Sequence, residues 1–147
     1  IHADVRPRNI LVGKDGVAKI TDFGLCVNVY ETPERIVNDP IVRTPEFMSP
    51  EQFANWELDQ RGDIYCLGAT FFYMLTGRTP FLASDLHTLM YRQKMEDPPS
   101  PREFNPKLPL SICSIVLKML EWDPFDRYQQ YEELIQDVET YLRETKM

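Results

Sequence analysis

The sequence predicts a mainly helical α+β fold in which one small β-hairpin precedes a helical body. Three patterns indicate this: a turn dipeptide between two short β-favouring runs, a long apolar stretch in mid-chain, and two later segments with apolar residues at helical spacing. A length of 147 residues is typical of one domain and is enough for a buried core.

The expected hairpin comes first. Its two apolar runs, 10–12 and 17–20, are separated by Gly-Lys-Asp-Gly at 13–16. Asp-Gly between such runs is a strong signal for a tight hairpin turn. Residues 25–43 are polar, contain two prolines and have no period, so we predict a long loop there. Loops of this length in compact domains usually serve a function.

The middle of the chain predicts a central helix. Nearly every residue of 63–76 is apolar, aromatic or small, which predicts a helix buried on all sides, and Gly77 is placed to cap its end. Apolar spacing predicts a further helix that begins near Leu86 and ends before the proline-rich residues 98–101. Those prolines predict an extended connector.

Two more helices are predicted towards the C-terminus. Apolar residues recur at helical spacing over 112–120 and again over 131–142. Ser111 stands directly before the first of these segments, where we expect it to cap the helix.

Composition limits the classes of function. The chain has 23 acidic and 16 basic side chains, a net charge of −7, which disfavours nucleic acid and anionic membrane surfaces as partners. Its longest strongly apolar stretch, residues 64–75, is too short to span a membrane. We therefore expect no membrane segment and a cytoplasmic location, which also agrees with three widely spaced cysteines, Cys26, Cys66 and Cys113.

Polar residues flank the predicted hairpin. Asp4, Arg6 and Asn9 precede its first strand, and Asp22 follows its second, so the hairpin should bring both carboxylates to one edge. Carboxylates and an amide suit Mg²⁺, and a nearby cation suits a transferring phosphoryl group. Polar turn residues and turn caps are the alternative interpretation, equally good for the first segment taken alone.

The motif H-x-D-x-x-x-x-N at 2–9, followed by Asp-Phe-Gly at 22–24, resembles the catalytic loop and metal-binding triplet of protein kinases. Four later segments, 44–48, 49–51, 63–68 and 123–127, resemble further protein-kinase motifs in the order in which kinases carry them. Each signal is weak alone, but the ordered series covers nearly the whole chain and is most similar to bacterial serine/threonine kinases. It implies the large, C-terminal lobe of the kinase fold.

The resemblance implies roles for five residues around ATP and Mg²⁺. Asp4 would orient the substrate hydroxyl and accept its proton. Asn9 and Asp22 would hold the Mg²⁺ that bridges the ATP phosphates. Arg6 takes the place of a lysine that contacts the transferring phosphoryl group, and Thr44 would bond Asp4 and Arg6 and favour serine or threonine acceptors.

Four further residues have structural roles by the same resemblance. Glu51 and Arg127 would form a buried ion pair that anchors the activation segment. Asp63 would accept backbone N–H groups of the loop around His2, which would itself be a packed core residue.

Departures from the family pattern include two substitutions near the predicted catalytic residues and one absence. Ala3 replaces the arginine that pairs with an activation-segment phosphate, and Arg6 replaces lysine, whose charge is more compact. No glycine-rich loop or V-A-I-K strand precedes Ile1. We therefore expect residues 1–147 to be a partial kinase domain from a longer chain that carries the small lobe, with exposed apolar surface where that lobe would pack, and to be a poor enzyme alone.

The function that follows is ATP-dependent transfer of a phosphoryl group to serine or threonine hydroxyls of protein substrates. One alternative is a pseudokinase, a binding or scaffold module that uses a groove near residues 86–95, which Ala3 and Arg6 favour. The other is a small-molecule phosphotransferase, against which Glu51 and the segment before it argue.

Overall fold

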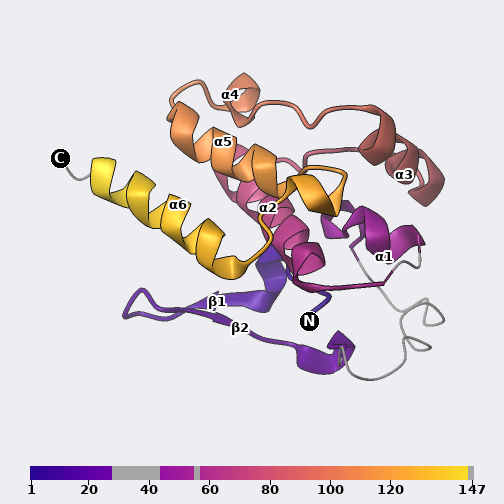
Figure 1. Cartoon of the computed structure of the whole chain (residues 1–147), viewed down its shortest axis with the longest axis horizontal. Helices are drawn as coiled ribbons and strands as arrows, with labels where there is room; N and C mark the ends of the chain where they lie inside the picture. The colour runs from indigo at the N-terminus through magenta and orange to yellow at the C-terminus, as the bar shows by residue number, and fades with distance from the viewer. Residues whose placement is uncertain (28–43, 55–56, 146–147) are drawn as a thin grey trace.

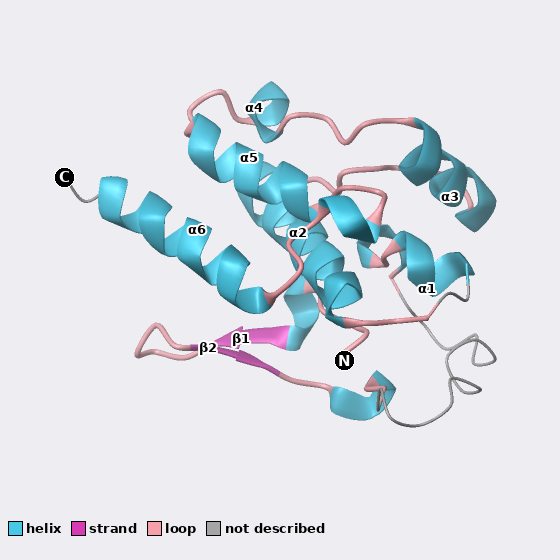
Figure 2. Cartoon of the chain, in the orientation of Figure 1, coloured by secondary structure: helices cyan, strands magenta, loops and turns pink. Residues whose placement is uncertain are grey.

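A computed structural model describes residues 1–27, 44–54 and 57–145. The described part is mainly helical, with one two-stranded antiparallel sheet to the side of the helical body (Figures 1 and 2). The predicted fold class is therefore confirmed. Most of the loop predicted over 25–43 lies outside the described residues.

The hairpin consists of β1 (Ile10–Val12) and β2 (Ala18–Ile20), which pair so that Ile10 faces Ile20. Gly16 in the turn has a φ of +78°, in the left-handed region that glycine adopts without steric cost. The Asp-Gly signal therefore predicted the hairpin correctly. Its function in the molecule is to join the two polar segments at its open end.

Helix α2 (Gln60–Thr76) is the centre of the molecule. It begins three residues before the apolar stretch because the Asp59 carboxylate accepts a hydrogen bond from the backbone N–H of Arg61 at 2.8 Å. Gly77 ends it, as predicted, with a φ of +73°. Burial on all sides holds as far as Phe72 but not in the last turn, where the side chain of Met74 is exposed.

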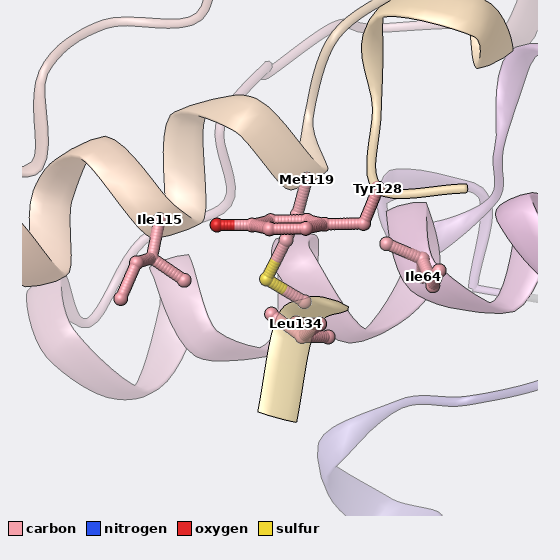
Figure 3. Close-up of a cluster of buried hydrophobic side chains, with 5 residues drawn as sticks. All are labelled: Ile64, Ile115, Met119, Tyr128 and Leu134. Carbon is pink, nitrogen blue, oxygen red and sulfur yellow. The ribbon is translucent and has the colours of Figure 1, made fainter. Parts of the chain in front are cut away.

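The core lies where α2 meets α5 (Leu110–Met119) and α6 (Tyr131–Glu144). Figure 3 shows one buried cluster, which consists of Ile64, Ile115, Met119, Tyr128 and Leu134. The approach of α2 to α5 is close because Gly68 has no side chain: a Cβ there would lie 2.7 Å from the Cβ of Met119.

Two local predictions on the connections were wrong. Ser111 does not cap α5, because the helix begins one residue earlier and Pro109 is its N-cap, with no side-chain bond. The proline-rich connector is extended only in part, since Pro101 starts the short helix α4 (Pro101–Phe104). Proline is favourable at a first helical position, and Ser100 with Glu103 forms a capping box there.

The remaining elements are short. Helix α1 (Pro50–Ala54) comes shortly after a 3-10 turn at Pro45–Phe47. Helix α3 (Leu86–Met95) has Asp85 as its N-cap. In the part of the chain that the structure describes, four 3-10 turns lie at Pro7–Asn9, Phe23–Leu25, Pro45–Phe47 and Pro124–Asp126. No helix in the described ranges is both long and apolar enough to cross a membrane.

We expect Gly68→Ala to lower the free energy of unfolding by about 1–3 kcal/mol, because the added methyl group overpacks the α2–α5 contact. Urea denaturation measures the effect. Ser114→Ala, an alanine substitution at an exposed position of α5, is the control and should change stability by less than about 0.5 kcal/mol. Equal stability of the two variants would contradict the close contact.

Candidate functional site

The segment before β1 is anchored to the central helix by one carboxylate. Asp63 on α2 accepts hydrogen bonds from the backbone N–H of His2 at 2.6 Å and of Ala3 at 2.8 Å. All three residues are buried. The contact expected of Asp63 is therefore present, and it fixes the backbone immediately before Asp4. Burial and the Asp63 carboxylate raise the pKa of Tyr131 to about 12.

Asp4, Arg6 and Asn9 form one buried cluster. The side-chain amide of Asn9 donates to Asp4 Oδ2 at 2.8 Å and to the Asp4 carbonyl at 2.9 Å. Arg6 Nε lies 3.2 Å from the same carboxylate oxygen, an ion pair in which the Nε–H makes no hydrogen bond. The structure thus brings together the three residues that the sequence placed before the hairpin.

Thr44 joins this cluster through the arginine. Arg6 Nη1 donates to Thr44 Oγ1 at 2.6 Å. The hydrogen bond expected between Thr44 and Asp4 is not formed, because the guanidinium group bridges the two side chains instead. The second described segment is therefore linked to Asp4 indirectly.

Asp22 stands at the same end of the hairpin. The pairing of β1 with β2 continues by one residue, since the backbone N–H of Thr21 donates to the carbonyl of Asn9 at 2.8 Å. Asp22 follows directly, is exposed and has a φ of +65°. His2 is buried and reaches this segment too, with Nε2 3.1 Å from the Thr21 carbonyl and its ring edge-on to Phe23 at 5.2 Å.

The oxygen atoms at this end suit a hard cation. Within the described residues neither the Asn9 Oδ1 nor the Asp22 carboxylate accepts a hydrogen bond from another side chain. Mg²⁺ prefers such oxygen ligands. The described residues contain no group of three or more histidine, cysteine, aspartate or glutamate side chains that fits a metal.

Glu51 and Arg127 form a bidentate ion pair in the interior. The two guanidinium N–O distances are 2.6 and 3.0 Å, and the side chains are 4% and 0% exposed. Arg127 also donates to the carbonyl groups of Arg61, Glu121 and Trp122 at 2.7–2.9 Å. The pair therefore connects α1 to the start of α2 and to the segment that follows α5.

A cavity of about 500 Å³ adjoins the Asp4 cluster. Phe47 and Tyr73, whose rings meet edge to face at 5.8 Å, supply apolar wall. Its charged lining residues are Arg6, Arg8, Arg78 and Glu46. Of these four residues, the sequence analysis singled out only Arg6. Arg8 and Arg78 match no motif residue, and they line the same cavity only in the folded chain.

One buried side chain was also missed. Gln52 donates from Nε2 to the Ala3 carbonyl at 2.7 Å. It follows Glu51 directly, and nothing in the local sequence distinguishes it from a surface residue of a short helix.

We expect Glu51→Ala to lower the free energy of unfolding by about 3–5 kcal/mol, because it leaves the Arg127 guanidinium buried without its counter-charge. Chemical denaturation measures the loss. Glu96→Ala breaks the exposed Arg92–Glu96 pair and should cost less than about 1 kcal/mol. A similar small cost for both variants would contradict the structural importance of the buried pair.

Comparison with known proteins gives one family. The family model described as "Protein kinase domain" matches residues 1–138. The chain is 34% identical over 140 residues to the serine/threonine-protein kinase PrkC of Bacillus subtilis, and 31% identical over 139 residues to the serine/threonine-protein kinase PknB of Mycobacterium tuberculosis. These alignments cover 95% and 94% of this chain but only 22% of each relative. The chain thus spans about a fifth of their length.

Proposed function

Because this chain belongs to the protein kinase domain family, we propose that it serves ATP-dependent phosphoryl transfer to serine or threonine hydroxyls of protein substrates. Residues 1–147 would be the part of a longer kinase that runs from the catalytic loop to the last helix. The single observation that carries the proposal is the buried cluster of Asp4, Arg6 and Asn9 at the open end of the hairpin.

Asp4 is the proposed base. Its Oδ2 is held by Asn9 and Arg6, and within the described residues its Oδ1 has no hydrogen-bond partner. One oxygen is therefore fixed and the other remains available to a substrate hydroxyl. Positioned proton acceptors of this kind contribute about 10²–10⁴-fold to rate.

Asn9 and Asp22 are the residues that would hold Mg²⁺ with ATP. When bound, Mg²⁺ neutralises charge on the phosphates. The chain's own contribution is to place an amide oxygen and a carboxylate at one edge, through the Asn9–Thr21 backbone bond. Arg6 adds a fixed positive charge next to Asp4, and its planar guanidinium group contacts Asp4 and Thr44 at once.

A small lobe in the same longer protein is the proposed partner of the hairpin. Exposed apolar side chains gather on the hairpin and just after it: Leu11, Val12, Val17, Ile20 and Phe23. So many exposed apolar side chains in one short segment are typical of a segment that packs against another part of a protein. Clamping of the nucleotide between the two lobes would complete the proposed ATP site.

We expect Asp4→Asn to reduce phosphoryl transfer by about 10²–10⁴-fold, since the amide cannot accept the substrate proton. The assay is ³²P transfer from Mg²⁺-ATP to a serine- and threonine-containing protein, with the whole protein that carries this chain. Asp15→Asn, in the exposed hairpin turn, is the control. Full activity of Asp4→Asn would refute the assignment of Asp4 as base.

The cavity beside Asp4 is where we place the substrate peptide. The chain has a net charge of −7, yet three arginines and one glutamate line this cavity. Arg8 and Arg78 are exposed, so their charges can meet a peptide. Charge complementarity therefore favours acidic residues near the acceptor hydroxyl.

We expect the double variant Arg8→Glu and Arg78→Glu to raise KM for an acidic serine peptide about three- to tenfold and to lower it for a basic one. Steady-state kinetics at two salt concentrations measure the change, which should shrink at high salt. Arg143→Glu, on the exposed face of α6, is the matched charge control. An unchanged ratio of the two KM values would contradict the peptide preference.

A binding or scaffold module is the second candidate function. It is favoured by a groove of about 300 Å³ between α1 and α3, in the region near residues 86–95. Phe53, Met90, Tyr91 and Trp122 are among the residues that line it. The transfer assay separates the candidates, because a module without turnover gives no phosphorylated product with or without Asp4.

A further inference from the structure

Gln52 makes hydrogen bonds in three directions from the interior of α1. Its Nε2 donates to the Ala3 carbonyl at 2.7 Å. Its Oε1 accepts from the Ser49 backbone N–H at 2.9 Å, from the Ser49 hydroxyl at 3.3 Å and from the Cys66 thiol at 3.3 Å. Gln52 is 6% exposed and all its partners are buried.

The chemistry of these partners determines the amide orientation. The Ala3 carbonyl can only accept a hydrogen bond and the Ser49 backbone N–H can only donate one. Only a side chain with a donor and an acceptor at its tip satisfies both, and a carboxylate or an apolar group of the same length cannot. A glutamine is therefore specifically suited to this position.

The residue that Gln52 holds has an unfavourable backbone conformation. Ala3 has a φ of +63°, in the left-handed region that residues with a Cβ seldom adopt. Its N–H donates to Asp63 on α2, and its carbonyl accepts from Gln52 on α1. Both polar groups of the Ala3 backbone are thus bound by side chains from other elements.

We infer that Gln52 is a positioning residue for Asp4: it keeps Ala3 left-handed and so directs the carboxylate of the next residue. This inference rests on the proposed function. It also links the two sides of the site, because Ser49 continues the segment that begins at Thr44, which bonds Arg6. The conformation of residues 44–49 and the orientation of the Asp4 carboxylate are then coupled through the Gln52 side chain.

The test uses the whole protein that carries this chain. Gln52→Met keeps the length and burial but removes the donor and the acceptor. We expect kcat to fall about tenfold, the effect of losing one to two buried hydrogen bonds, while KM for ATP and for the peptide stays within about twofold. Gln52→Asn, which is polar but one methylene shorter, is the second variant if the methionine variant does not fold.

A matched control and a rescue separate positioning from stability. Gln60→Met removes another glutamine bond to a backbone carbonyl, that of Gln129 at 2.7 Å, and should lower the melting temperature without lowering kcat. Adding Ala3→Gly to Gln52→Met should restore kcat several-fold, because glycine adopts positive φ without steric cost. Unchanged kcat in Gln52→Met, or no restoration by glycine, would overturn the inference.

Hydrogen exchange gives a readout that does not require turnover. The backbone N–H of Asp4 donates to His2 Nδ1 at 3.3 Å, so its exchange rate reports the order of this segment. It should rise in Gln52→Met and not in Gln60→Met. If the parent protein transfers no phosphate, the proposed function fails, and the exchange result alone then supports or overturns the positioning of Asp4.

Discussion

The site depends on two hydrogen bonds that the Asp63 carboxylate accepts from the backbone N–H groups of His2 and Ala3. Asp63 lies near the start of the most buried helix, so its position is fixed by the core. A carboxylate that accepts two backbone N–H groups satisfies donors that would otherwise be costly to bury. The central helix thus places a loop whose first six residues belong to no helix or strand.

The rest of the site is built outward from that loop in short steps. Asn9 holds Asp4 from the loop's far end, the hairpin returns the chain to Asn9 through Thr21, and Arg6 reaches across to Thr44. Each step is a hydrogen bond between a polar side chain or backbone group and a neighbour already fixed. Local backbone strain at Ala3 is tolerated because the surrounding bonds determine its conformation.

Features with a local physical cause were predictable from the sequence. A turn dipeptide gave the hairpin, and an apolar stretch with a following glycine gave the central helix and its end. The motif positions also predicted the Glu51–Arg127 pair. Contacts between distant residues with no motif were not predictable: Gln52 meets Ala3 across 49 positions, and the guanidinium of Arg6 separates Thr44 from Asp4. Ser111 failed as a cap because α5 starts at Leu110, two residues before the start that the apolar spacing predicts.

The Glu51–Arg127 pair has a consequence for how the molecule unfolds. It joins residues 76 positions apart, and the same guanidinium group also binds a carbonyl in the first turn of α2 and one in the segment that follows α5. Contacts of such long range carry a larger entropic cost of loop closure than local contacts do. Because this pair cross-links α1 to the segment between α5 and α6, we expect these two parts to detach together in a partial unfolding event.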